Sequence, residues 1–238
     1  MLFYQATSST NDHGLDLASE GAVVLADSQT AGRGRRGHSW FSPPGSGLYV
    51  SVVLAPARAR VDATRATKLL TLGAGLAVAE GIQTATGLKA DLKWPNDLYV
   101  GRRKLAGILA EASGSPANLV VVGYGINVQP AAYPPDLRDR ATSIESELGR
   151  PVDRLLVLAE TLSGMASRYA DLLDGRYDAI LDAWKRRAPS AIGTRVSWTT
   201  TQASMSGVTA GIDSDGALLV ETGGGRDRIV AGELRWEP

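Results

Sequence analysis

Residues 32–37 read GRGRRG, which matches the G-x-G-x-x-G pattern of a dinucleotide-binding loop. Such a loop needs a helix to begin at its end, because the helix N-terminus holds the pyrophosphate. Here the next residues are HSWFSPPGSG, and two prolines with two further glycines prevent a helix. No Asp or Glu lies between Gly37 and Asp62, so the acidic residue expected about 20 positions later is missing. The sequence therefore excludes a dinucleotide-binding βαβ unit here and leaves a cationic glycine loop suited to an anion.

The first ninety residues alternate strand and helix patterns. Residues 2–6 and 22–28 are rich in strand formers, and between them a short helix is predicted to begin at Ser9 or Thr10 and to end at Gly21. The run GLYVSVVLAP is apolar almost throughout, which predicts a strand buried on both faces. Apolar residues recur every three or four positions across 62–86, which predicts a long packing helix.

The second half of the chain changes its pattern twice. LKADLKW, LYV, KLAGILAEAS and NLVVVGYGINV read as strands separated by the turn signals WPND, GRRK and SGSPAN. Residues 153–187 return to helix, predicted to place Leu155, Leu158, Leu162, Met165 and Tyr169 on one face and to end at Pro189. From Ile192 short alternating strands predict a small barrel with too little core to be very stable alone. We therefore expect a main domain at 1–189 and a C-terminal domain at 190–238.

Composition excludes several classes of function. Lys plus Arg (25) equals Asp plus Glu (25), so no overall field favours DNA and any anion site must be local. The absence of cysteine removes disulfides, thiolate metal sites and cysteine nucleophiles. The N-terminus turns polar by Gln5, and no apolar run reaches the roughly 18 residues of a membrane span. We expect a cytoplasmic protein that binds neither DNA nor membrane.

Seven short motifs together carry a family resemblance. STN, QTAGRGRRGHSW, KWPNDL, KLAGILAE, GYGINV, ATS and AGE follow one another in the order and spacing of the biotin protein ligases, which the chain resembles over essentially its whole length. Each motif alone is weak, but GRGRRG, KWPND and KLAGIL in combination are specific. The resemblance implies an α+β fold, in which a mixed β-sheet flanked by helices forms a class II synthetase-like catalytic domain, followed by a small SH3-like β-barrel.

The resemblance also implies an ATP-dependent reaction. The carboxylate of biotin attacks the α-phosphate of ATP to give biotinyl-AMP, and a lysine of a biotin carboxyl carrier protein then takes the biotinyl group. Mg²⁺ is expected to accompany ATP, with no residue assigned to hold it. Two anions must meet in the first step, so cations must neutralise them. Arg35 and Lys104 are expected between the two anions, and Lys93 and Asp97 complete the catalytic candidates, with Asp97 facing the incoming carrier lysine.

The remaining site residues follow from the same resemblance. The predicted biotin contacts are Ser9, Thr10, Gln29, Gly32, Arg33, Arg35, Lys104, Gly107, Gly123 and Gly125. The predicted ATP contacts are Arg36, His38, Trp40, Asn96, Ile126, Asn127, Thr142 and Ser143. His38 stands where the family often has an arginine, so the loop has one fixed cation fewer at this position.

Every motif also allows a purely structural interpretation. Ser9 and Thr10 can cap a helix, WPND can be only a turn, Trp40 can be a core residue, and the arginines can form a solvated patch. Among functions, a lipoate-type acyl-adenylate ligase shares the architecture but lacks GRGRRG, and a non-catalytic biotin-responsive regulator would not need Lys104, Asn127 and the arginines together. A DNA-binding repressor is disfavoured, because the first catalytic-domain strand is expected within a few residues of Met1. Monomer and homodimer both stay open.

Overall fold

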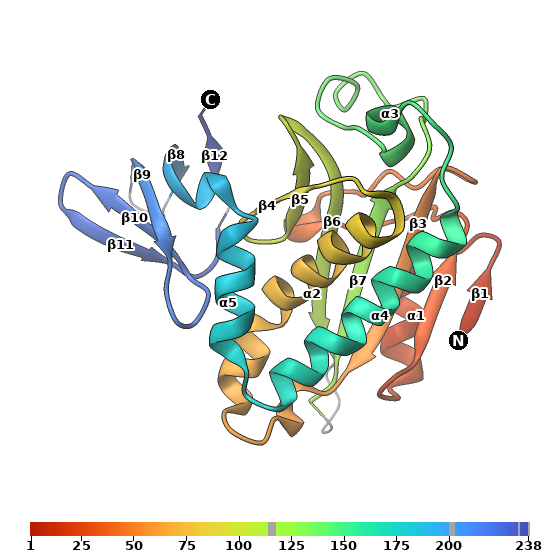
Figure 1. Cartoon of the computed structure of the whole chain (residues 1–238), viewed down its shortest axis with the longest axis horizontal. Helices are drawn as coiled ribbons and strands as arrows, with labels where there is room; N and C mark the ends of the chain where they lie inside the picture. Colours follow the sequence, from red (N-terminus) through yellow and green to blue (C-terminus); the bar gives the residue numbers. More distant parts are fainter. Residues whose placement is uncertain (114–117, 200–202, 233, 238) are drawn as a thin grey trace.

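The computed structural model describes residues 1–113, 118–199, 203–232 and 234–237. Within them the chain forms two sheets (Figure 1), a seven-stranded sheet of order β1-β2-β3-β7-β6-β5-β4 and a five-stranded sheet of order β11-β10-β9-β8-β12. The strands of the larger sheet are β1 (Leu2–Tyr4), β2 (Val23–Ala26), β3 (Gly47–Leu54), β4 (Asp91–Lys93), β5 (Asp97–Val100), β6 (Arg103–Ala112) and β7 (Val120–Asn127). β1 and β2 are parallel and the other neighbours are antiparallel, so the sheet is mixed as predicted.

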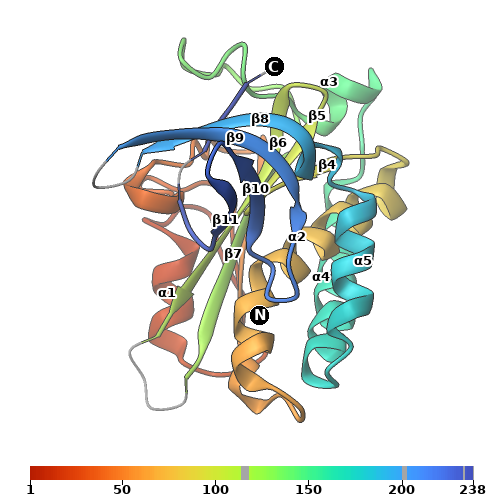
Figure 2. The same cartoon turned by 90° about the vertical axis from the view of Figure 1, so that its left-hand side faces the viewer.

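Helices cover both faces of the larger sheet. The helices are α1 (Thr10–Leu17), α2 (Ala63–Thr86), α3 (Ile144–Leu148), α4 (Arg154–Leu173) and α5 (Tyr177–Arg186). Figure 2 shows α1 on one side of the sheet and α2, α4 and α5 on the other. The main hydrophobic core lies between these three helices and the sheet, and a smaller cluster around Val53 and Val121 lies under α1.

The sequence predicted most element types correctly and some boundaries wrongly. All eight residues of β3 are buried, as its apolar run predicts. The first helix ends at Leu17, before Gly21, because Ala18 adopts a left-handed conformation at φ 44°. The helix expected over 153–187 is two helices, separated where Gly175 takes a φ of 76°. Leu155, predicted to share one face with Met165, is 73% exposed, whereas Met165 is buried.

The C-terminal strands form the predicted all-β unit and pack against the larger body. They are β8 (Ile192–Thr199), β9 (Ser204–Ile212), β10 (Leu218–Thr222), β11 (Gly225–Ile229) and β12 (Arg235–Trp236). Pro189 begins a short 3₁₀ turn, three residues after α5 has ended. The Trp94 indole N–H donates to the Gly216 carbonyl at 2.9 Å, and Leu218 and Val220 join the main core. The small unit therefore leans on the main one, while the boundary after residue 189 stays a prediction.

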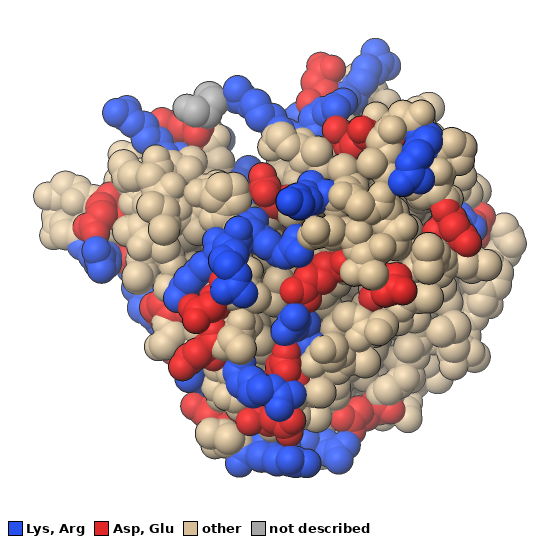
Figure 3. Space-filling model, viewed as in Figure 1, with Lys and Arg blue, Asp and Glu red and all other residues tan. Residues whose placement is uncertain are grey.

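Strand alternation decides which residues can reach a ligand. On β7, Tyr124 and Ile126 face the main core, whereas Gly123, Gly125 and Asn127 face the α1 side of the sheet. Opposite charges are interspersed over the face shown in Figure 3, in line with the balanced composition. No helix in the described part of the chain is long and apolar enough to cross a membrane.

Candidate functional site

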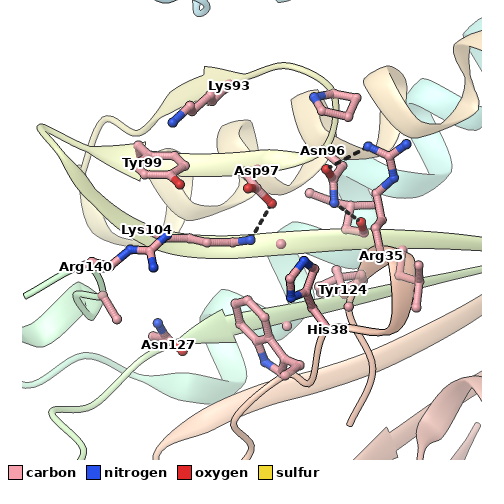
Figure 4. A pocket seen from close by; sticks show the side chains of 18 of the residues that line it. Arg35, His38, Lys93, Asn96, Asp97, Tyr99, Lys104, Tyr124, Asn127 and Arg140 are labelled. Atoms are coloured by element: carbon pink, nitrogen blue, oxygen red, sulfur yellow. Dashed lines mark hydrogen bonds and ion pairs between the residues drawn. The ribbon is translucent and has the colours of Figure 1, made fainter. Parts of the chain in front are cut away.

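A cavity of about 1020 Å³ opens on the α1 side of the larger sheet. Its floor comes from β5, β6 and β7 (Figure 4). Its walls come from the arginine loop, from residues 133–141 and from the C-terminal sheet. Most of the predicted site residues line it: Ser9, Thr10, Gln29, Arg33, Arg35, Arg36, His38, Trp40, Lys93, Asn96, Asp97, Lys104, Gly107, Gly123, Gly125 and Asn127. Residues from five separate motifs therefore surround one space.

Four predicted residues do not line the cavity. They are Gly32, Ile126, Thr142 and Ser143. Ile126 is fully buried in the main core on the opposite face of the sheet, because its neighbour Asn127 takes the cavity face. Ser143 caps α3 by accepting the Ser146 N–H, and Thr142 holds Asn127 by accepting its amide at 2.9 Å. Thr142 therefore does not line the cavity but fixes the side chain of Asn127, which does.

Lys104 and Asp97 form an ion pair on the cavity floor. Lys104 is on β6 and Asp97 begins β5, and the Lys104 Nζ lies 2.6 Å from the Asp97 Oδ1. The Lys104 ammonium also lies 5.4 Å from the centre of the Trp40 ring. The backbone of Lys104 is held from the other side, because its N–H donates to the Arg140 carbonyl at 2.7 Å. The cation is thus fixed in place by three separate segments.

Arg35 reaches the same region from the glycine loop. One Nη lies 3.4 Å from the Asn96 Oδ1, and the Asn96 amide in turn donates to the Ile108 carbonyl at 2.7 Å. Burial, together with the neighbouring Arg36 charge, lowers the pKa of Arg35. A guanidinium that is partly desolvated beside another cation gains most from an anion placed next to it.

Lys93 has aromatic neighbours. Its Nζ lies 4.5 Å from the Tyr99 ring centre and 5.1 Å from that of Trp236 on β12. Burial lowers the pKa of Lys93, and the nearby Lys104 and Arg140 lower it further against the attraction of Asp97. Lys93 therefore links the cavity floor to the C-terminal sheet, a contact that its prediction as a catalytic residue did not include.

The arginine loop is held by its own hydrogen bonds. The Gly34 N–H donates to the His38 carbonyl at 2.7 Å, and the Trp40 N–H donates to the Gly32 carbonyl at 2.8 Å. Arg33 forms ion pairs with Asp12 at 2.6 Å and with Glu111 at 3.0 Å. Two carboxylates therefore neutralise Arg33, which sets it apart from Arg35 and Arg36 in the same loop.

A polar wall forms the end of the cavity at the start of α1. The Thr10 N–H donates to the Gln29 Oε1 at 2.9 Å, and the Gln29 amide donates to the Ser42 Oγ at 2.9 Å. Ser9 is the N-cap residue of α1 by position, but its side chain makes no capping hydrogen bond. The structural interpretation of STN as a simple cap is therefore wrong, and these polar groups face the cavity.

The glycines of the floor make room for an indole. Gly107 and Gly125 are cross-strand partners on β6 and β7. A Cβ on Gly125 would come within 2.3 Å of the Trp40 Nε1, and one on Gly107 within 3.1 Å of the Trp40 Cζ3. The Trp40 Nε1 is buried and has no hydrogen-bond partner among the described residues. Trp40 thus lies against the floor of the site.

No protein metal centre is evident in the part of the chain that the structure describes, where no group of three or more His, Cys, Asp or Glu side chains could hold an ion. The only carboxylate among the predicted catalytic residues is that of Asp97, which is taken up by Lys104. Glu233 of the AGE motif and residues 114–117 of the SGSPAN turn lie outside the described residues.

Several residues of the site were not predicted. They are Asn11, Asp12, Ser42, Ser51, Tyr99, Glu111, Tyr133, Arg140 and Trp236. Asn11 follows directly after Thr10, and Glu111 ends the motif KLAGILAE, so both lay within recognised motifs. Ser51 is the one polar residue in an otherwise apolar strand, which could have marked it.

The chain matches known families over most of its length. Residues 3–127 match the biotin/lipoate A/B protein ligase family, and residues 191–234 match the biotin protein ligase C terminal domain. The bifunctional ligase/repressor BirA of Bacillus subtilis is 36% identical over 98% of this chain and 73% of its own length. The biotin--[acetyl-CoA-carboxylase] ligase of Paracoccus denitrificans is 36% identical over 96% of this chain and 97% of its own.

A solved structure extends the similarity to the fold. The biotin protein ligase of Aquifex aeolicus, in complex with biotin and ATP, superposes with a TM-score of 0.86 at 29% identity, covering 99% of this chain and 98% of that one. The match includes the C-terminal sheet together with the larger one, which agrees with the packing described above.

Proposed function

The chain belongs to the biotin protein ligases, and from this premise we propose that it joins biotin to a lysine of a biotin carboxyl carrier protein at the expense of ATP. The observation that carries the proposal is the Lys104–Asp97 ion pair next to Arg35 on the cavity floor. This arrangement supports the proposal, because two anionic substrates need cations beside them and an attacking amine needs a group that can accept its proton.

In the first step an oxygen of the biotin carboxylate attacks the α-phosphorus of ATP. The bond between that phosphorus and the bridging oxygen breaks, and pyrophosphate leaves. Lys104 and Arg35 stabilise the negative charge shared between the carboxylate and the phosphate. Asp97 holds the Lys104 ammonium at 2.6 Å, so the cation does not have to be ordered during the reaction.

In the second step the amine of the carrier lysine attacks the carbonyl carbon of biotinyl-AMP. An amide bond forms, the bond from carbon to the phosphate oxygen breaks, and AMP leaves. The attacking nitrogen loses a proton, and Asp97 is the carboxylate on the cavity floor that can accept it. Asp97 thus orients a cation in the first step and receives a proton in the second.

Biotin is assigned to the end of the cavity at Thr10 and Gln29, and the nucleotide to the part lined by Asn96, His38 and Asn127. This order puts the biotin carboxylate and the α-phosphate over the floor between them. Mg²⁺ enters with ATP as part of the substrate, because this ion keeps its waters and binds mainly through substrate phosphates. The carrier lysine comes from a biotin carboxyl carrier protein that can present one side chain to the cavity mouth.

Biotin-dependent release of pyrophosphate tests the first step without any carrier. The purified chain should release pyrophosphate from Mg-ATP only when biotin is present, and biotin should shift its melting temperature upward. A chain that binds biotin but never cleaves ATP would leave a non-catalytic regulator as the function. Activity with lipoate in place of biotin would assign it to the other branch of the matched family.

A further inference from the structure

A continuous chain of hydrogen bonds runs behind the polar wall of the cavity. It connects residues from the glycine loop, β6, α1 and β3, in the order Arg33, Glu111, Asn11, Ser51, Thr10 and Gln29. Arg33 and Glu111 are 78 positions apart, and Asn11 and Glu111 are 100 positions apart. Three members, Arg33, Thr10 and Gln29, were assigned to ligand binding. The purpose of Glu111, Asn11 and Ser51 is left unexplained.

Glu111 sets the direction of the chain. Its Oε2 accepts from the Asn11 Nδ2 at 2.6 Å and from an Arg33 Nη at 3.0 Å. An ionised carboxylate can only accept, so Asn11 must turn its NH₂ group toward Glu111. The Asn11 Oδ1 then faces the Ser51 Oγ at 2.5 Å and accepts its proton. Reversing the Asn11 amide would place its oxygen against the carboxylate, which is unfavourable.

The donor and acceptor roles of Ser51 determine those of Thr10. A hydroxyl has one proton, so Ser51 cannot also donate to Thr10, whose Oγ1 lies 2.8 Å away. The single proton of Thr10 is used within the wall, by Ser51 or by the Gln29 Oε1 at 3.2 Å. Thr10 can therefore offer only an acceptor to the cavity. Gln29 donates one amide hydrogen to Ser42 and keeps the other, so the wall presents an acceptor beside a donor.

We propose that Glu111 is a positioning residue that fixes this polarity and makes the wall selective for a ring carrying an N–H group next to a carbonyl. The cyclic urea of biotin has this pattern, whereas the dithiolane ring of lipoate has neither group. The inference rests on the proposed function. It adds a residue that touches no ligand but decides which of the two acids used in this family is accepted.

The test compares biotin affinity, measured by calorimetry without ATP, among single variants of the full chain. Glu111→Leu removes the closer of the two acceptors of the Asn11 amide, at 2.6 Å, and leaves only the Leu109 carbonyl at 3.5 Å. Asn11 can then reverse, after which Ser51 donates to Thr10 and occupies an oxygen lone pair that the ligand needs. A mismatched buried hydrogen bond corresponds to a loss of roughly tenfold to a hundredfold in affinity. Asp12→Asn removes the other carboxylate that pairs with Arg33 and does not change the partners of Asn11. This variant should reduce biotin affinity by less than about fivefold.

A double-variant cycle distinguishes an effect transmitted through this chain of hydrogen bonds from general damage to the fold. Ser51→Ala interrupts the same chain of hydrogen bonds at the next residue. The losses of biotin affinity in Ser51→Ala and in Glu111→Leu should therefore not add in the double variant. The side chain of Glu111→Gln can donate or accept a hydrogen bond, so this variant should lose roughly threefold to tenfold in biotin affinity. It replaces Glu111→Leu in the comparison if Glu111→Leu does not fold. The affinity for lipoate should not fall in any of these variants, since the dithiolane ring of lipoate forms no hydrogen bonds with the polar wall.

Three results would overturn the inference: additive losses, a Glu111→Leu protein no weaker than Asp12→Asn, or equal losses for biotin and lipoate. A wild-type chain that fails to bind biotin at all would instead overturn the proposed function, and this inference with it. The two failures are therefore distinguished by the wild-type measurement alone.

Discussion

The Lys104 Nζ and the Asp97 Oδ1 lie 2.6 Å apart, on two adjacent strands at the floor of the cavity. The side chains are 31% and 22% exposed, so the pair is partly shielded but open to a ligand. Lys104 is assigned to adenylation, whereas Asp97 is assigned to holding Lys104 in adenylation and to accepting a proton in transfer. Variants of Lys104 and of Asp97 should consequently change the rates of adenylation and of transfer by different factors.

Replacing Lys104 by alanine should abolish adenylation while the fold is kept. Loss of one group that stabilises developing negative charge costs about 10²- to 10³-fold in rate. The measurement is biotin-dependent pyrophosphate release, with circular dichroism and melting temperature as controls for folding. A variant with near-native pyrophosphate release would show that Lys104 does not bridge the anions.

Replacing Asp97 by asparagine should slow transfer more than adenylation. The asparagine oxygen can still accept a hydrogen bond from Lys104, whereas a neutral amide cannot take the proton of the carrier lysine. Single-turnover experiments that follow biotinyl-AMP formation and its consumption by the carrier measure both steps in one reaction. Equal reduction of both rates would remove the separate role of Asp97 in transfer.

Replacing Gly125 by alanine should displace the indole of Trp40 and weaken ligand binding. The new Cβ would meet the Trp40 Nε1 at 2.3 Å, closer than atoms can approach. Gly224→Ala is a matched control, because a Cβ there meets nothing within 4 Å. Calorimetric titration with biotin should show reduced affinity for Gly125→Ala alone. Equal affinities in the two variants would mean that the position of Trp40 is not needed.

Lys93 should make the stability of the protein depend on alkaline pH. Burial, helped by Lys104 and Arg140, lowers its pKa below the ordinary 10.5. Between the lowered value and 10.5 the unfolded chain binds more protons than the folded one, so this contribution to stability rises with pH and is constant above 10.5. Urea unfolding at stepped pH should show the wild type gaining stability relative to Lys93→Met in that window. Parallel pH curves for the two proteins would contradict a lowered pKa.

Local patterns predicted most of the elements, and the family resemblance predicted most of the cavity lining. Apolar periodicity predicted α2, a continuous apolar run predicted β3, and the order of short motifs indicated the residues of the floor. The break at Gly175 was missed, because apolar periodicity continues on both sides of a left-handed glycine. Leu155 was misplaced because the buried residues of α4 are Val157, Thr161, Met165 and Leu172, and Leu155 lies away from the stripe that they form.

The partners of the site residues could not be predicted from local patterns. Glu111 meets Arg33 and Asn11 only because β6 pairs with β7, over which α1 packs, and the contacts span 78 and 100 positions. Ile126 was assigned to the site with its neighbour Asn127, although consecutive residues of a strand face opposite sides. Lys93 was predicted as catalytic from its motif, and its contact with Trp236 required the position of the C-terminal sheet.

The most direct test of the account is the mass of a biotin carboxyl carrier domain after incubation with the purified chain, biotin and Mg-ATP. The account predicts that the carrier gains the mass of one biotin less one water, that a carrier with its acceptor lysine replaced by arginine gains nothing, and that Lys104→Ala protein gives no product in the same time. An unchanged carrier mass with the wild-type chain, under conditions where biotin is bound and ATP is present, would contradict it.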